Sequence, residues 1–341
     1  MTVAQRVGQL FAMGLAGDRL GPTEVTAIRS HHVGSVWFTE TTTGGTSAVR
    51  AVTTAVQNQA TASATGGVRF YVAANQEGGQ IQALRGSGFS TIPTAVTQGR
   101  VAPSTLRRTA AVWGHELSRA GVNLNFAPVM DVVPPGTDAQ NQPIGVLQRE
   151  FGHTPSRVAS HGTAFIHGMS DAGIATTAKH FPGLGRVQGN TDNVAGVVDT
   201  ETSATSSSLQ PFGAAVTAGV PFVMVALATY TRIDAAHLAV FSPVVMRLLL
   251  GRLGFKGVIM SDDLGAATAV ASVPPAERAI EFLSAGGDLV VSKTADATAV
   301  MADAVLARAS SHPAFASRVD AAVRRILAAK DTSGLLPCSA N

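Results

Sequence analysis

This 341-residue chain contains the segment Ala178-Lys179-His180-Phe181-Pro182-Gly183-Leu184-Gly185-Arg186, in which two basic residues precede a proline and a glycine-rich loop. The mostly apolar residues 172–175 precede it and Pro182 interrupts it, which predicts a strand that ends near His180. Lys179 and His180 then lie where a strand gives way to a loop. Basic side chains in that position are suited to holding a polar ligand.

The loop that follows continues as Val187-Gln188-Gly189-Asn190-Thr191-Asp192-Asn193. Its glycines allow many backbone conformations, which predicts a mobile loop. A mobile loop can deliver a side chain to a substrate after the substrate has bound.

Strand-like and helix-like segments alternate along the rest of the chain. The apolar run Val68–Ala74 is typical of a parallel strand buried on both faces, and it stops at Asn75-Gln76-Glu77-Gly78-Gly79. Apolar periodicity predicts further strands over Val33–Phe38, Val122–Val133, Pro221–Leu227, Gly257–Met260 and Gly286–Val291. It predicts helices over Val3–Met13, Ser47–Ala62, Pro103–Ala120, Ser156–Ala172, Ser207–Ala218, Ser242–Leu253, Pro275–Ala285, Thr294–Ala309 and Ala314–Ala329.

This alternation predicts an α/β fold, a (β/α)8 TIM barrel, in a single domain over residues 1–341. Polar residues follow five strands, and the carboxyl ends of barrel strands all meet on one face. An open sheet would collect ligands only at its switch point. The polar residues concerned are Asn75, Asp131, Lys179-His180, Thr229 and Asp262-Asp263.

Composition excludes several classes of function. Hydrophobic residues make up 45% of the chain and charged residues 14%, with a formal net charge of +3, which favours a large core over disorder. Clusters of Lys and Arg with interleaved aromatics are absent from the sequence, so we expect no nucleic-acid partner. It also has no apolar run of about 18 residues, so we expect no membrane span.

Two features of the sequence concern the compartment. The single cysteine, Cys338, cannot form an internal disulfide, so cysteine usage leaves the redox compartment open. The first residues resemble an amphipathic helix rather than a signal peptide. We therefore expect a cytoplasmic location, or an exported protein if a leader was removed.

Two neighbouring acids, Asp262 and Asp263, follow the short apolar strand that begins at Gly257. Adjacent strand residues point to opposite sides, so only one of them can face the barrel axis directly. If Asp262 faces Lys179 and His180, opposite charge keeps it ionised as a nucleophile, while Asp263 orients it or caps the next helix. The alternative is that both acids are helix caps or metal ligands.

Five motifs in this order resemble those of the glycoside hydrolase family 3 β-N-acetylglucosaminidases, over about Val3 to Ala329. The motifs are Gln76-Glu77-Gly78-Gly79, Asn125-Phe126-Ala127-Pro128-Val129-x-Asp131, Arg149-x-Phe151-Gly152, Lys179-His180-Phe181-Pro182-Gly183-x-Gly185 and Gly254-Phe255-x-Gly257-Val258-Ile259-x-Ser261-Asp262-Asp263-Leu264. The resemblance implies a single-domain TIM barrel that acts by a retaining double displacement, without a cofactor or a metal.

The resemblance also implies roles for individual residues. Asp262 matches the nucleophile that forms a glycosyl-enzyme intermediate. Lys179, His180 and Arg149 match residues that bind the sugar hydroxyls and the acetamido side. Asp131 either pairs with one of these cations or is a structural residue at a strand end. Glu77 is expected to orient its loop through backbone amides. His153, His161 and His167 are expected to be ordinary surface or packing residues.

The sequence departs from the family pattern at three places, and the first two lie in the expected sugar pocket. Asn75 stands where the family usually has Asp, and Gln80 and Ala83 replace arginines of the following turn, with Arg85 further on. An amide lacks the charge that strengthens hydrogen bonds to sugar hydroxyls. The pocket is therefore expected to favour a different or modified sugar.

The third departure concerns the acid/base. The family usually has an Asp-x-His dyad in the loop after Lys179-His180, and here these positions hold Asn190 and Asp192. A carboxylic acid with a raised pKa can protonate a leaving oxygen, so Asp192 is the candidate and Asp199 the reserve. The alternative is that residues 190–192 merely form an Asx turn.

Two functions follow from these features. The first is a retaining glycosidase that removes terminal β-linked N-acetylglucosamine, or a related sugar, from peptidoglycan- or chitin-derived glycosides. The second is an altered family member that only binds sugar or acts on another glycoside, by transglycosylation or phosphorolysis among other reactions. In both cases the partner is a small carbohydrate and the protein is expected to be a monomer.

Overall fold

Eight parallel strands close into a barrel in the computed structural model, which describes residues 1–337. Neighbouring barrel strands are consecutive along the chain, and the last strand pairs with the first. The strands are β1 (Phe11–Leu15), β2 (Ser35–Phe38), β3 (Tyr71–Ala74), β6 (Leu124–Asn125), β7 (Ala175–Phe181), β9 (Phe222–Val225), β12 (Val258–Asp263) and β13 (Leu289–Ser292). The predicted (β/α)8 barrel is confirmed.

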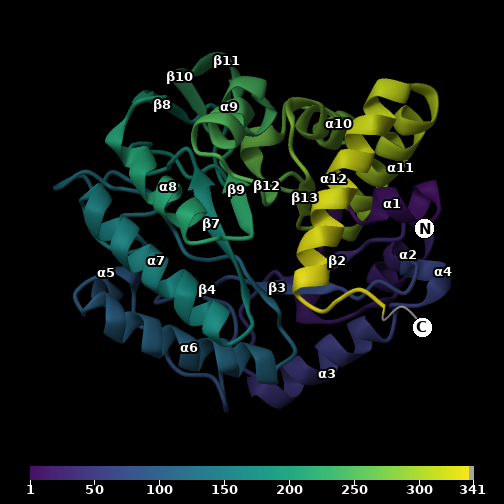
Figure 1. Ribbon diagram of the computed structural model, residues 1–341, viewed down its shortest axis with the longest axis horizontal. Coiled ribbons are helices and arrows are strands. Elements are labelled where there is room, and N and C mark those ends of the chain that lie inside the picture. Colours follow the sequence, from purple (N-terminus) through teal and green to yellow (C-terminus); the bar gives the residue numbers. More distant parts are fainter. Residues whose placement is uncertain (338–341) are drawn as a thin grey trace.

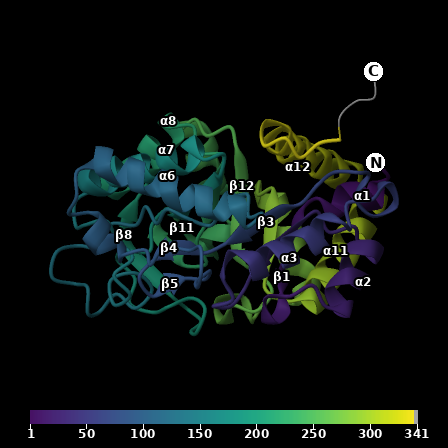
Figure 2. The ribbon, with the colours of Figure 1, turned by 90° about the horizontal axis from the view of Figure 1, so that it is seen from below.

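Helices pack around the outside of this barrel (Figure 1). Figure 2 shows the same arrangement from below, with α6 and α7 on one side and α11 and α12 on the other. The α-helices are α1 (Val3–Gly8), α2 (Pro22–Ser30), α3 (Gly45–Gln57), α4 (Ala62–Thr65), α5 (Ala95–Gln98), α6 (Pro103–Arg119), α7 (Pro155–Asp171), α8 (Gln210–Thr217), α9 (Pro243–Arg247), α10 (Pro275–Ala285), α11 (Ala295–Ser311) and α12 (Pro313–Thr332). Short 3-10 or π turns cover Ala16–Asp18, Ser207–Leu209, Ala239–Phe241, Leu248–Arg252 and Thr268–Val270.

The barrel strands are buried on both faces because the helices cover their outer side, as the unbroken apolar runs predict. Aromatic rings fill the interior, and Tyr71 meets Phe222 edge to face with 5.3 Å between ring centroids. The buried amino group of Lys330 is also part of this core, and burial lowers its pKa to about 7. Nζ of Lys330 donates to Oε1 of Gln9 and to two backbone carbonyls, each within 2.9 Å, which ties α12 to the barrel.

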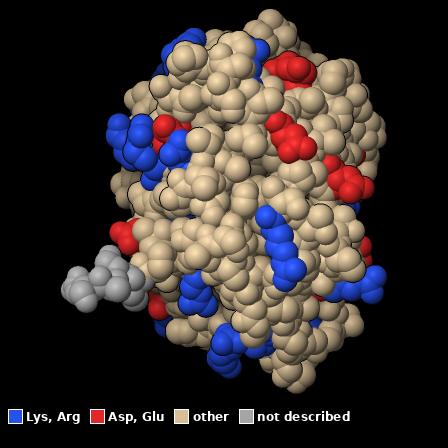
Figure 3. Space-filling view, turned by 90° about the vertical axis from the view of Figure 1, so that its right-hand side faces the viewer, with Lys and Arg blue, Asp and Glu red and all other residues tan. Residues whose placement is uncertain are grey.

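The surface carries few charges, as the composition predicts. Figure 3 shows basic and acidic side chains interspersed with wide uncharged areas on one face. Within residues 1–337, no helix has both the length and the apolar character needed to cross a bilayer. The expectation for Cys338 falls outside the described residues.

The prediction of one helix over Val3–Met13 was wrong. The helix α1 ends at Gly8, and Phe11–Leu15 forms the first barrel strand, β1, with all five residues buried. A Cβ on Gly8 would lie 2.0 Å from the carbonyl oxygen of His32, so the chain passes too close to that backbone for a side chain. Helical spacing in a segment this short hid the change from helix to strand.

The predicted strand Val122–Val133 is much shorter than expected. Only Leu124 and Asn125 form a continuous ladder, and beyond them a single isolated bridge joins Val129 to Lys179 of β7. Pro128, which lies between, lacks the backbone N–H that an unbroken ladder needs. Outside the barrel, a three-stranded sheet was not predicted: it consists of β8 (Val198–Ser203), β10 (Thr229–Arg232) and β11 (Asp234–Leu238). A small hairpin of β4 (Gln76–Gly78) and β5 (Ile81–Gln82) follows β3.

Candidate active site

A cavity of about 420 Å³ lies at the carboxyl ends of the barrel strands. This is the face on which enzymes with this fold place their sites. Apolar walls come from Trp37, Phe126, Leu147 and Met224, among others. The charged and amide side chains that line it are Asn75, Arg149, Lys179, His180, Asn190, Asp192, Asn193, Asp262, Asp263 and Lys293.

A buried network of charges forms one wall of this cavity. Glu77 accepts two hydrogen bonds of 2.8 Å from Arg149 and lies 2.6 Å from Nζ of Lys179. The same Nζ donates to Oδ1 of Asn75 at 2.7 Å. Only 5% of the Glu77 side chain and 3% of the Lys179 side chain are exposed. The network therefore fixes two cations and an amide at the cavity wall.

The protonation of this network follows from its charges. Burial alone would raise the pKa of Glu77, but the Arg149 guanidinium and the Lys179 ammonium outweigh it and lower the pKa to about 2. Burial lowers the pKa of Lys179, and the charge of Glu77 opposes that shift. Glu77 is therefore an anion at neutral pH. Its partners are the two cations, not the backbone amides that the sequence analysis expected.

A second buried carboxylate, Asp131, positions His180. Its Oδ2 lies 2.8 Å from Nδ1 of His180, and its Oδ1 accepts hydrogen bonds from the backbone amides of His180 and Leu184. Asp131 is fully buried and does not line the cavity. It therefore acts through the histidine, as a fixed acceptor that sets the ring orientation.

The strand β12 brings Asp262 and Asp263 to the cavity. Asp263 accepts hydrogen bonds from the backbone amides of Gly265, Ala266 and Lys293, so it fastens the turn after the strand. Asp262 lines the cavity with Lys179 and His180, and its Oδ1 accepts only a bond from the amide of Asp263 among the described residues. Asp262 is thus the acid whose carboxylate is available to a ligand.

Asp192 lies on the loop after β7 and lines the same cavity. Its side chain is exposed toward solvent on one side. Partial desolvation and the charge of Asp262 raise the pKa of Asp192, while His180, Arg149 and Lys179 oppose the rise. The two carboxyl groups therefore interact electrostatically across the cavity, and the Asp192 group holds a proton at a higher pH than a free aspartate.

The loop of Asp192 is fastened at several points. The amide of Asp192 donates to Oδ1 of Asn190 at 3.0 Å, which is the Asx turn considered above. Backbone amides of Thr268 and Ala269 donate to the carbonyls of Asp192 and Thr191. The Asx turn and the cavity position are thus both present, and the loop is joined to the segment that follows Asp262.

Two residues considered from the sequence lie away from the cavity. Asp199 is buried in β8, where its carboxylate accepts bonds from Glu201 N, Thr202 N and Thr202 Oγ1. Thr229 pairs within the three-stranded sheet. Asp199 therefore has a structural set of partners, and Asp192 alone of the two acids faces Asp262.

Several residues that line the cavity were not predicted from the sequence. Lys293 follows β13 directly, so a rule that takes the first polar residue after each strand would have found it. Trp37 and Phe126 form aromatic walls, but within their apolar runs nothing distinguishes them from core residues. Arg85 donates to the carbonyls of Gln82 and Gly79 and holds its own loop instead of lining the cavity.

Comparisons with known proteins agree with this geometry. The family model described as the glycosyl hydrolase family 3 N terminal domain matches residues 2–329. A β-hexosaminidase of Methylococcus capsulatus is 36% identical over 247 residues, which are 70% of this chain and 72% of that protein. A β-hexosaminidase of Xanthomonas oryzae is 29% identical over 291 residues, 83% of each chain.

A solved structure is similar over nearly its whole length. The β-N-acetylhexosaminidase from Beutenbergia cavernae superimposes with a TM-score of 0.95 at 48% sequence identity, covering 97% of this chain and 99% of that one. The barrel, the cavity at the carboxyl ends of its strands and the match of the family model over nearly all the chain lead to one conclusion. The chain belongs to glycosyl hydrolase family 3 and is a glycosidase.

Proposed function

We propose that this glycosidase removes terminal β-linked N-acetylglucosamine, or a closely related sugar, from peptidoglycan- or chitin-derived glycosides with retention of configuration. The observation that carries the mechanism is that Asp262 and Asp192 line the wall of one cavity, where burial and then the charge of Asp262 raise the pKa of Asp192. Two carboxyl groups with different proton affinities are what a retaining glycosidase requires. The names of the relatives support the choice of sugar.

The proposed reaction has two steps. In the first, an oxygen of Asp262 attacks the anomeric carbon while protonated Asp192 donates its proton to the glycosidic oxygen, and the aglycone leaves as an alcohol. In the second, Asp192 takes a proton from water, the resulting hydroxide attacks the anomeric carbon, and the bond to Asp262 breaks. The sugar is released with the starting configuration and both acids return to their first states.

The surrounding residues hold the sugar for this reaction. Lys179, Arg149 and Asn75 present donors on one wall, and His180 is oriented by Asp131 beside them. Glu77 is buried and forms ion pairs with Lys179 and Arg149. These pairs neutralise part of the positive charge and hold the two cations in place, so neither needs to pair with Asp262. A prearranged donor set lowers the entropy cost of orienting the substrate.

The alternative of an altered, non-hydrolytic family member is not favoured. The similarity to β-hexosaminidases over most of the chain supports hydrolysis. A phosphorolytic reaction would bring an anionic phosphate toward the carboxylate of Asp192 during the second step, which like-charge repulsion opposes.

A mechanism-based fluorosugar of the N-acetylglucosamine type tests the assignment. We expect the wild type to form a covalent adduct on Asp262, located by peptide mass spectrometry, and to hydrolyse an aryl N-acetylglucosaminide. Asp262→Asn should abolish both. In the matched control Asp263→Asn, the adduct should remain on residue 262. A label on any other residue, or unchanged turnover by Asp262→Asn, would show that Asp262 is not the nucleophile.

The sugar preference is tested separately. The wild type should hydrolyse an aryl N-acetylglucosaminide faster than the matching glucoside, galactoside or xyloside. A faster reaction with one of the other sugars would reject the proposed substrate while leaving the nucleophile assignment intact.

A further inference from the structure

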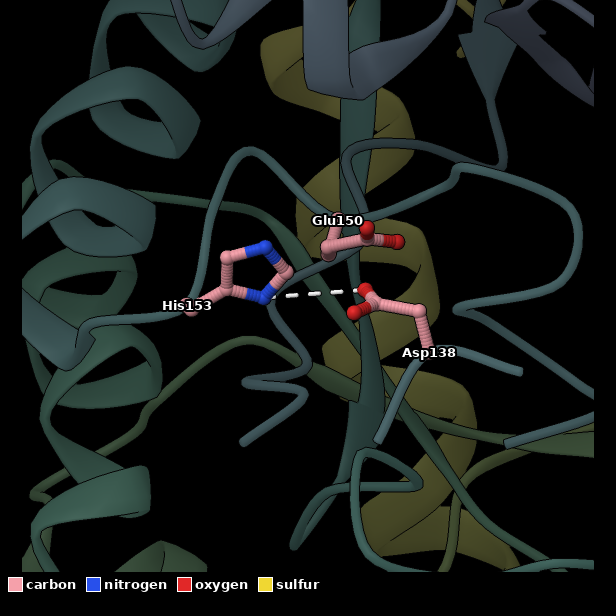
Figure 4. A group of neighbouring side chains, drawn as sticks. All are labelled: Asp138, Glu150 and His153. Carbon is pink, nitrogen blue, oxygen red and sulfur yellow. Dashed lines mark ion pairs between the residues drawn. The ribbon is translucent and has the colours of Figure 1, made fainter. Parts of the chain in front are cut away.

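A second group of ligand-type side chains lies in the long loop between β6 and α7. Asp138, Glu150 and His153 each offer an oxygen or nitrogen atom, and these three atoms lie within 4.8 Å of one another. Figure 4 shows the three side chains beside one another, with the imidazole ring of His153 facing the carboxylate of Asp138. None of the three residues lines the cavity described above.

Glu150 forms the buried side of this cluster. It is 1% exposed, and within residues 1–337 no hydrogen-bond partner reaches its Oε2. A buried carboxylate oxygen without a partner is costly, and such groups are rare unless an ion or water satisfies them.

The other two side chains open the cluster to solvent. The Asp138 and His153 side chains are 38% and 37% exposed. Nδ1 of His153 lies 3.2 Å from the carbonyl oxygen of Val133 and 3.7 Å from Oδ1 of Asp138, so the ring is held with its edge toward the carboxylates. An ion can therefore reach the cluster from solvent and meet Glu150 at its inner end.

The loop backbone brings these residues together independently of any ion. A Cβ on Gly145 would lie 2.7 Å from Cα of Asp138, so the loop folds back on itself at this glycine. Oδ1 of Asn141 accepts the backbone amides of Ile144 and Gly145, and its Nδ2 donates to the carbonyls of Leu184 and Val187. The ligand atoms are thus presented by a prearranged loop.

We propose that Asp138, Glu150 and His153 bind one divalent cation of the transition-metal class represented by Zn²⁺. Two carboxylates and one imidazole suit Zn²⁺, Mn²⁺ or Fe²⁺, whereas Ca²⁺ and Mg²⁺ prefer sites built wholly from oxygen. Three protein ligands leave a position for water, which the exposure of Asp138 and His153 permits.

The bound cation has a consequence for the cavity. It joins Asp138 to Glu150 and His153, and so restrains the two ends of the segment between them, which includes Arg149. Pro143, Leu147 and Arg149 in this segment line the cavity. The cation is a positioning element: it restrains the cavity wall and does not touch the reacting atoms.

Isothermal titration calorimetry tests the site. The wild type, freed of metal by a chelator that is then removed, should bind one equivalent of Zn²⁺. Its melting temperature should rise with Zn²⁺ concentration, because the ion binds the folded state. Asp262→Asn should bind Zn²⁺ equally well, which separates this site from the carboxylates of the cavity.

Variants of the cluster identify the ligands. Glu150→Gln and the more exposed Asp138→Asn should each weaken Zn²⁺ binding by at least about 100-fold, since losing even an outer-shell partner costs about 10- to 100-fold. Glu281→Gln, the same change at an exposed position of α10, should bind like the wild type. Absence of Zn²⁺, Mn²⁺ and Fe²⁺ binding by the wild type would overturn the proposal. Wild-type affinity in both cluster variants would overturn it too.

Discussion

Glu77 and Arg149 are 72 residues apart in sequence and are joined by two hydrogen bonds of 2.8 Å each. The same carboxylate also forms an ion pair with Lys179, so one buried anion is the counter-ion of two buried cations. Glu77→Gln would leave both cations without their counter-ion. We expect a loss of about 3 to 5 kcal/mol in the free energy of unfolding, because breaking a buried pair leaves an uncompensated charge. Urea denaturation at pH 7 measures it.

The exposed pair of Arg107 and Asp171 supplies the control. It has the same two-point geometry, but both side chains are about half exposed. Solvent screens such pairs, so Asp171→Asn should change the stability very little. If Glu77→Gln were no more destabilising than Asp171→Asn, the buried network would not be a stabilising element.

Stability in acid should depend on Glu77 in a defined pH window. The pKa of Glu77 is about 2 in the folded state, compared with an ordinary value of 4.5. The folded state therefore binds the proton less tightly than the unfolded state does. The resulting stability is fully present above pH 4.5 and is lost as the pH falls toward 2, by about 3 kcal/mol for this difference in pKa.

Comparison with Glu77→Gln isolates this contribution, since the other carboxylates titrate in both proteins. The stability difference between wild type and variant should shrink by about 3 kcal/mol between pH 5 and pH 2. Denaturant unfolding at several pH values measures it. Parallel stability curves across this range would contradict the low pKa.

The barrel and much of the cavity could be predicted from the sequence, because buried parallel strands are continuous apolar runs that end in polar residues. Lys179 lies near the carboxyl end of β7 and Asp262 near that of β12, and the fold brings strand ends together. The strand β1 was missed because its apolar residues continue those of a short helix. The pairing of Glu77 with Arg149 was missed because sequence spacing carries no information on contacts between separate loops.

The cluster of Asp138, Glu150 and His153 shows the same limit. His153 lies at the start of an expected outer helix, so it was predicted to be an ordinary surface or packing residue. Only the fold of the loop at Gly145 brings the three side chains together. Short-range periodicity therefore predicts elements and strand ends, whereas clusters built by irregular loops require coordinates.

The amide at Asn75 should limit the affinity for sugar. Its Oδ1 accepts a hydrogen bond from Nζ of Lys179. Lys179 and Arg149 are cations and Glu77 is an anion, so these three side chains together carry one excess positive charge. Asn75→Asp would balance this charge and give sugar hydroxyls a charged acceptor. A charged acceptor contributes roughly 1 kcal/mol more than a neutral one, so the Kd for N-acetylglucosamine should fall about fivefold.

Calorimetric titration with N-acetylglucosamine measures this change. Asn193→Asp adds a charge elsewhere on the cavity lining and serves as the control, because Asn193 has no contact with Lys179 in the described hydrogen bonds. Weaker binding by Asn75→Asp would indicate that the amide donor, rather than its acceptor, is what the sugar uses.

The role of Asp192 as acid/base can be separated from every other role by varying the leaving group. A poor leaving group needs a proton as it departs, whereas an activated aryl group does not. Asp192→Ala should therefore lower kcat/KM for a disaccharide by about 100- to 10,000-fold and for an activated aryl glycoside far less. With the aryl substrate the second step should become slow, and added azide should restore turnover because it attacks without a general base.

The pH profile gives an independent measure of the same group. Because the acid must be protonated in the first step, kcat/KM of the wild type for the disaccharide should fall as the pH rises through the raised pKa of Asp192. Asp192→Ala should lose this alkaline limb. Asp199→Asn should keep the alkaline limb, because the Asp199 carboxylate accepts hydrogen bonds from backbone amides of β8 and does not face Asp262. Loss of these bonds should lower the stability of the protein and leave the pH profile unchanged. Equal losses on both substrates in Asp192→Ala, with the alkaline limb intact, would assign the proton transfer to another group.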